Sequence, residues 1–184
     1  LPSFPTRCSS DLILLQFVFV IAAILDGFAF TLESLVGQSI GAKKFTEYKT
    51  AIKKSFLLAL VSSLACTICL FALGDTLIAQ MTATQAVQEY AQEYLIWVAI
   101  SPLIGLLAWI MDGVFIGATQ TRHIRNTMVV SIAIYVVLWA VLTEYFGNHG
   151  LWCSLIVLYA LRGLTLYQKL PNLERSSFPG VVQS

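Results

Sequence analysis

Residues 94–119 read YLIWVAISPLIGLLAWIMDGVFIGAT, an apolar run whose single charged residue is Asp112. At ~1.5 Å per residue, a helix of this run is long enough to cross the ~30 Å hydrocarbon core of a bilayer. The chain as a whole is 58% hydrophobic and only 11% charged. Because a helix satisfies its own backbone hydrogen bonds in lipid, this composition predicts an all-α integral membrane protein.

Four further apolar stretches flank this run. The five predicted spans are residues 13–41, 55–73, 94–119, 128–146 and 151–167. Apart from Arg7, every basic residue falls on one side of this five-span weave. These residues are Lys43, Lys44, Lys49, Lys53, Lys54, Arg122, Arg125, Arg162, Lys169 and Arg175. Since basic residues collect in cytoplasmic loops, that side and the C-terminus are predicted to be cytoplasmic.

The two ends of the chain differ from its apolar body. Residues 1–12 are polar, rich in turn-forming residues, and unlike a signal peptide. They resemble the translation of a common sequencing-adapter oligonucleotide, with Cys8 departing, so we interpret them as an artefact; the alternative is a disordered leader. Residues 13–170 are then part of a longer protein, and the N-terminal portion of that protein is missing from this sequence. Residues 171–184 are predicted to form a cytoplasmic tail without regular structure.

Asp26 and Glu33 lie inside the first span. Seven residues are nearly two helical turns, so both carboxylates share a face. An ionisable residue at membrane depth is a functional-site hypothesis by default. We predict that this face borders a water-filled cavity and binds cations or carries protons. The alternative is a pair of structural groups that hydrogen-bond to neighbouring helices.

Asp112 places an ionisable residue at membrane depth in the third span as well. Pro102 removes a backbone hydrogen bond and should kink this helix. Bent helices with an acid at membrane depth are typical of binding sites in alternating-access transporters. The alternative is that Asp112 pairs with a donor of a neighbouring helix. Two small-xxx-small pairs, Gly37 with Gly41 and Gly113 with Gly117, predict close helix packing.

Other candidate motifs give weaker evidence for a functional site. Arg162 is interpreted as an interfacial anchor near the end of the last span. His123 and His149 have no second ligand at metal spacing, and the C-x-x-C of Cys66 and Cys69 lies in an apolar span, so we predict no metal site. The motifs of soluble enzymes are absent, and a net charge of +1 suggests no nucleic-acid partner. We predict that the protein is not an enzyme.

Three stretches resemble one transporter family. They are LDGFAFTLESLVGQSIGAKK (25–44), YLIWVAISPLIGLLAWIMDGVFIGATQTRHIRNTM (94–128) and GNHGLWCSLIVLYALRGLTL (147–166). They are similar to the C-terminal half of the multidrug and toxic compound extrusion (MATE) transporters of the DinF-type branch. The resemblance implies twelve helices in two six-helix lobes, of which this chain holds helices eight to twelve. It also implies a missing N-terminal lobe as partner and a location in the bacterial inner membrane.

The resemblance further implies a function. Such transporters export amphipathic, often cationic compounds by antiport with protons or sodium ions, without an organic cofactor. Asp112 and Glu33 match acidic positions on the tenth and eighth helices of related proteins. Two alternatives stay open. One is a lipid-carrier flippase of the same superfamily, which the cytoplasmic placement of all ten basic residues disfavours. The other is a membrane scaffold subunit that transports nothing, in which the acids are structural.

Overall fold

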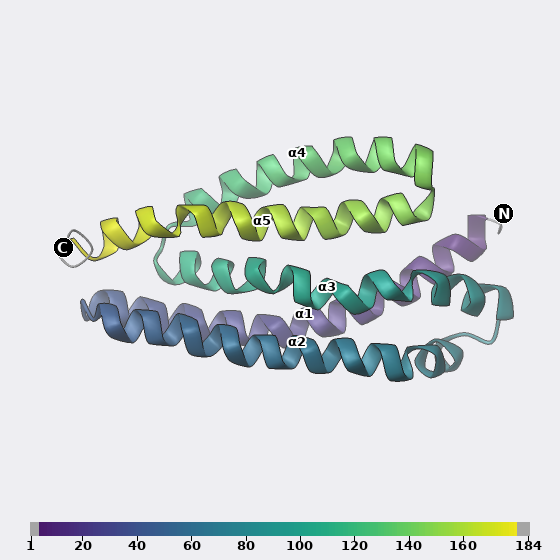
Figure 1. Cartoon of the computed structure of the whole chain (residues 1–184), viewed down its shortest axis with the longest axis horizontal. Helices are drawn as coiled ribbons and strands as arrows, with labels where there is room; N and C mark the ends of the chain where they lie inside the picture. Colours follow the sequence, from purple (N-terminus) through teal and green to yellow (C-terminus); the bar gives the residue numbers. More distant parts are fainter. Residues whose placement is uncertain (1–3, 180–184) are drawn as a thin grey trace.

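The computed structural model describes residues 4–179, and all its regular structure in that range is helical (Figure 1). The helices are α1 (Phe4–Gly41), α2 (Phe45–Met81), α3 (Gln85–Gly117), α4 (Thr121–Phe146) and α5 (Asn148–Ser177). All five are long and apolar enough to cross a membrane. The predicted all-α class with five membrane-spanning helices is therefore confirmed.

The helices are longer than the predicted spans. α2 begins at Phe45 and not at residue 55, and α5 continues to Ser177 and not to residue 167. An apolar window marks only the part of a helix that lipid covers, whereas the polar flanks here keep helical geometry beyond it. The prediction of an irregular tail from residue 171 is wrong up to Ser177, and residues 180–184 lie outside the described part.

The N-terminal residues also belong to a helix. α1 begins at Phe4, so the expectation of a disordered leader is wrong for residues 4–12, whereas their adapter origin stays a prediction. The carboxylate of Asp11 accepts hydrogen bonds from Asn148 Nδ2 at 2.8 Å and from Trp152 Nε1 at 3.2 Å. This contact fixes the start of α1 against the start of α5. Apolar periodicity could not reveal it, because it depends on polar side chains 137 residues apart.

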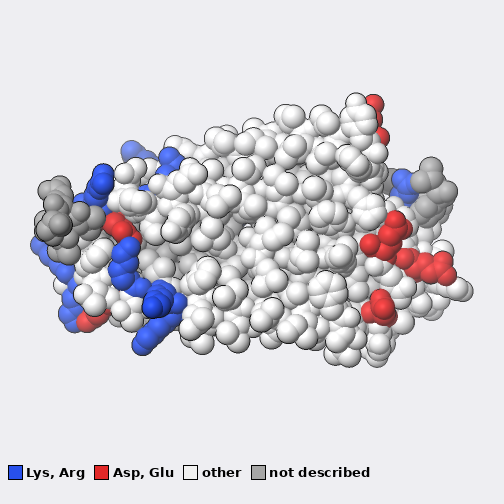
Figure 2. Space-filling view, in the orientation of Figure 1, with Lys and Arg blue, Asp and Glu red and all other residues white. Residues whose placement is uncertain are grey.

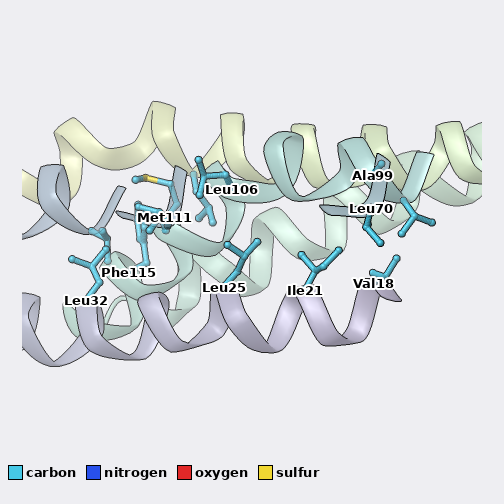
Figure 3. Packing of buried hydrophobic residues seen from close by; sticks show 14 of the residues in the cluster. Val18, Ile21, Leu25, Leu32, Leu70, Ala99, Leu106, Met111 and Phe115 are labelled. Atoms are coloured by element: carbon cyan, nitrogen blue, oxygen red, sulfur yellow. The ribbon is translucent and has the colours of Figure 1, made fainter. Parts of the chain in front are cut away.

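α3 is the central helix of the bundle. Its most apolar window is 61% buried inside the protein, whereas that of α4 is 6% buried. Figure 3 shows buried side chains of α1, including Leu25 and Leu32, that point toward α3, with Leu32 near Phe115. α4 contacts mainly α5 and presents most of its surface outward (Figure 1). Residues of α3 are therefore the ones best placed to contact two neighbouring helices.

Apart from Arg7 near the start of α1 and Arg162 within α5, the basic residues gather at one end of the bundle. Figure 2 shows lysine and arginine side chains around the connection of α1 to α2 and the end of α5. There Lys49 Nζ lies 2.6 Å from Glu174 Oε1, and the ring of Phe178 packs 5.2 Å from that of Tyr48. These contacts hold the extension of α5 against the start of α2.

Two helices end in the same backbone motif. At the end of α1, Lys44 N donates to Ser39 O at 2.9 Å. At the end of α3, Gln120 N donates to Phe115 O at 2.9 Å, and Thr119 N donates to Ile116 O at 2.8 Å. This Schellman arrangement places one residue in the left-handed region, where glycine is favoured. Here that residue is Lys43 (φ 56°) or Thr119 (φ 58°), and both carry a Cβ.

We therefore expect Thr119→Gly to stabilise the protein. Relief of the left-handed strain outweighs the added flexibility of the unfolded chain by about 0.5–1 kcal/mol. Thermal unfolding in detergent should show a higher Tm. Ala118→Gly is the matched control, because Ala118 has a right-handed φ of −82° and gains nothing from the change. An equal rise in Tm for both variants would contradict this explanation.

Candidate functional site

Glycines let α3 lie directly against α1. A Cβ built on Gly113 would lie 2.5 Å from the carbonyl oxygen of Ala29, and one on Gly117 would collide with the backbone of Glu33. Gly37 lies opposite Gly117, with a modest 3.4 Å clearance for a Cβ. Such close approach is the physical use of small residues four positions apart in membrane helices.

In the predicted pair of Gly37 and Gly41, only Gly37 lies at such a helix contact. A Cβ on Gly41 would meet nothing within 4 Å among the described residues.

The glycine contacts also fix the level of Asp112, which precedes Gly113 and therefore lies beside Ala29. That level is ~18 Å along α1 from Gly41, at ~1.5 Å per residue. Asp112 thus lies deep within the apolar part of the bundle.

Asp112 forms an ion pair with Arg162 of α5. Arg162 Nη2 donates to Asp112 Oδ2, and the two side chains are 23% and 16% exposed, respectively. Gly163 makes this pairing possible, because a Cβ at that position would lie 2.9 Å from the backbone nitrogen of Ala108. The glycine lets α5 approach α3 closely enough for the adjacent arginine to reach the carboxylate.

The interpretation of Arg162 as an interfacial anchor is wrong. It rested on a last span that ended at residue 167, which would place Arg162 near the membrane surface. α5 continues to Ser177, so Arg162 lies ~22 Å from the end of its helix. The long side chain turns inward and pairs with Asp112 instead of reaching the headgroup region. Arg162 is therefore not among the peripheral basic residues.

The ion pair is incomplete. Asp112 Oδ1 and Arg162 Nε are both buried and have no hydrogen-bond partner among the described residues. A structural arginine–carboxylate pair is commonly bidentate, with two parallel N–H···O bonds. Buried polar atoms left without a partner are uncommon and call for an explanation. Here one carboxylate oxygen of the membrane-embedded acid is free to accept a further ligand.

The structure separates the three predicted acids. Asp26 is half-buried on α1 and close enough to Asp112 to act on it electrostatically. Glu33, also half-buried, lines a groove of about 620 Å³ between α1 and the end of α3, together with Ser34 and Gln38. Neither Asp26 nor Glu33 forms an ion pair within residues 4–179. Asp112 and Asp26 therefore make one candidate site, and Glu33 lies nearer the basic end of the bundle.

Two aromatic rings lie beside the ion pair. Trp109 and Tyr159 are each three residues before a member of the pair, so helical geometry places them one turn away on the same faces. Their ring centroids are 5.2 Å apart. The Trp109 ring also lies over Gly105, where a Cβ would collide with it. Sequence patterns did not single out this aromatic pair, because its members lie 50 residues apart on two helices.

Pro102 lies inside α3 and is buried. It cannot donate to Val98 O, but the hydroxyl of Ser101 does so at 2.9 Å. The next carbonyl, Ala99 O, accepts a hydrogen bond of 2.8 Å from Thr67 of α2. Serine and threonine hydroxyls and neighbouring helices are what make proline tolerable in a membrane helix. α3 thus continues past Pro102 with its carbonyls satisfied.

We expect Thr67→Val to lower stability by about 1 kcal/mol, because it removes an interhelical hydrogen bond at nearly constant volume. Thermal unfolding in detergent measures the loss. Ser63→Ala is the control, since the buried hydroxyl of Ser63, one turn earlier, has no partner among the described residues. Its removal should be neutral or stabilising. Equal losses for the two variants would mean that the bond to Ala99 contributes nothing.

Comparison with known proteins decides the family. Residues 12–143 match the model of the MatE family. The chain belongs to the MatE family. The resemblance seen in the sequence is thereby confirmed, and with it the nature of the chain as a multi-pass membrane protein of MATE type.

Two curated proteins match the chain. It is 36% identical over 169 residues to DNA damage-inducible protein F of Escherichia coli (strain K12), covering 87% of the chain and 36% of that protein. It is 22% identical over 158 residues to Protein DETOXIFICATION 44, chloroplastic, of Arabidopsis thaliana, covering 86% of the chain and 30% of that protein. The chain therefore spans about a third of each relative's length. No solved structure matches it.

Proposed function

We propose that this chain is the C-terminal lobe of a longer MATE transporter that exports amphipathic cations by antiport with protons or sodium ions. One observation carries the proposal. Asp112 lies deep in the bundle, and its Oδ1 has no hydrogen-bond partner in the described residues. A buried carboxylate oxygen without a hydrogen-bond partner is suited to bind a cation, because a buried polar atom that stays unsatisfied is costly.

The surroundings of Asp112 support a cationic and aromatic substrate. Asp112, Asp26 and Glu33 place three carboxylates along α1 and α3, and Arg162 offsets only one of them. An excess of acids favours cations and disfavours the anionic carrier lipids that a flippase would move. The faces of Trp109 and Tyr159 can attract a cation and stack on planar rings. These features together suit amphipathic organic cations.

Antiport requires that the lobes change their relative position when either the coupling ion or the substrate is bound. The lobes must not change position when the site is empty. A charged carboxylate that must move through an apolar interior opposes the change. Binding of a proton, a sodium ion or a cationic substrate at Asp112 removes that penalty, so occupancy shifts the balance between two lobe arrangements. The chain supplies the acid, and the missing N-terminal lobe would supply the surface against which it moves.

The proposal places the protein in the bacterial inner membrane with its C-terminus in the cytoplasm. The gathering of basic residues at one end of the bundle supports this orientation (Figure 2). Membrane lipid and small amphipathic compounds are then its partners. The ion gradient supplies the free energy for transport, and no organic cofactor takes part.

Expression of the complete reading frame tests the proposal. The frame is recovered by sequencing the locus upstream of the codon for Ile13, where the proposal expects the helices of an N-terminal lobe. In a bacterial strain that lacks its own efflux pumps, the full protein should raise resistance to amphipathic cations such as ethidium. If the protein is instead a scaffold subunit, expression should not raise resistance. Resistance would stay at the level of the empty strain, and neutralising Asp26, Glu33 and Asp112 together would change nothing.

A further inference from the structure

We propose that Arg162 is a tethered counter-cation, which holds the Asp112 carboxylate in this conformation and which a cationic ligand must displace in order to bind there. The inference rests on the proposed function in one respect, that Asp112 binds cations. It adds a residue of another helix that sets how tightly they bind. In this conformation, the cationic partner of Asp112 belongs to the protein itself.

The geometry of the pair favours competition over a permanent structural role. Only one nitrogen of the guanidinium contacts the carboxylate, and the second carboxylate oxygen and Arg162 Nε are buried without partners in the described part. A pair built for stability would use the bidentate fork and satisfy these atoms, since a half-satisfied buried pair gains little over apolar packing. A single-point contact is also the easiest to exchange for another cation.

The neighbouring groups fit an exchange of cations. Among the charged groups that face the pair, Asp26 of α1 is near enough to interact with Asp112 and could help to hold an incoming cation. Tyr159, one turn before Arg162, interacts electrostatically with the guanidinium and forms the aromatic pair with Trp109. A displaced guanidinium therefore still has the Tyr159 side chain within electrostatic range.

Competition predicts a definite direction for binding. A ligand that binds only the open form has its affinity reduced by the fraction of molecules in that form. If Arg162 occupies Asp112 in about nine molecules of ten, removing its charge strengthens binding about tenfold. A structural ion pair predicts the reverse, because its loss would disorder the site and weaken binding.

The test measures binding of tetraphenylphosphonium to the purified complete transporter and to three variants. Arg162→Gln should bind this probe about tenfold more tightly than the wild type. Arg162→Lys, with a shorter side chain and a weaker hold on Asp112, should fall between the two. Arg175→Gln is the matched control, because Arg175 is exposed in the last turn of α5, and it should bind as the wild type does.

Affinity for Arg162→Gln equal to or below that of the wild type, in protein that elutes as a single species, would overturn the proposal. If Arg162→Gln cannot be purified, Arg162→Lys decides in the same way, since it must still bind more tightly than the wild type. Failure of the proposed function has a different signature, in which the wild type and every variant leave tetraphenylphosphonium unbound.

A second readout is the stability of the pair as a unit. The double variant Asp112→Asn with Arg162→Gln leaves no buried charge unpaired, so its Tm should exceed that of Arg162→Gln alone. The same double variant should not bind tetraphenylphosphonium, because the carboxylate is gone. A double variant that is less stable than Arg162→Gln would contradict the pairing in the complete protein.

Discussion

Asp112→Asn in the complete transporter is expected to reduce resistance to amphipathic cations to the level of cells without the transporter. Asparagine keeps an oxygen that can accept the hydrogen bond from Arg162, so α3 and α5 should still pack. It cannot carry the negative charge that binds a proton, a sodium ion or a cationic substrate. The charge is lost while the shape is kept, so the expected defect is in transport and not in membrane insertion.

Drug susceptibility and the amount of transporter in the membrane fraction are measured together. Asp75→Asn is the matched control, because Asp75 is exposed near the end of α2 and forms no ion pair within residues 4–179. It should confer wild-type resistance. Wild-type resistance from Asp112→Asn would end the role given to this carboxylate.

Gly113→Leu is expected to be the most damaging change to the fold. At this position even a Cβ would lie 2.5 Å from the carbonyl oxygen of Ala29, and that oxygen belongs to backbone that cannot turn aside. A leucine forces α1 and α3 apart over the most buried part of the bundle. Overpacking commonly costs about 1–3 kcal/mol, and rigid backbone on the opposing side places this case at or above about 3 kcal/mol.

Size-exclusion chromatography and thermal unfolding in detergent should show little monodisperse Gly113→Leu protein and a much lower Tm. Gly41→Leu serves as control, since that glycine also belongs to a small-xxx-small pair but has nothing within 4 Å of a built Cβ. It should behave as the wild type does. Equal damage from both variants would contradict the explanation that Gly113 is needed for the close approach of α1 to α3.

The sequence was sufficient for the class, the number of helices and most of the glycines at which helices pack closely, whereas the helices that meet there come from the structure. Each of these depends on a local or periodic pattern. Apolar runs predict membrane spans, and glycines four apart predict close packing. Gly113 and Gly117 do lie against Ala29 and Glu33, as such spacing requires.

The ion pair could not be predicted because it depends on how far α5 extends. Hydropathy ended the last span at residue 167, and the ten further helical residues place Arg162 well inside. The structure does contain the pairing that the sequence analysis gave as the alternative for Asp112, with a donor on a neighbouring helix. Asp11 is a similar case, since its bonds to Asn148 and Trp152 form only once α1 and α5 lie together.

In the proposed mechanism, an ion gradient drives cation export through a site that includes Asp112. The most direct measurement is ethidium flux in proteoliposomes that contain the complete transporter, under an imposed proton or sodium gradient. We expect ethidium flux against its gradient with one of these ions, no flux without an ion gradient, and no flux for Asp112→Asn. If correctly folded wild-type protein moves no ethidium under either gradient, or if Asp112→Asn moves it as well as the wild type does, the proposed antiport through Asp112 is wrong.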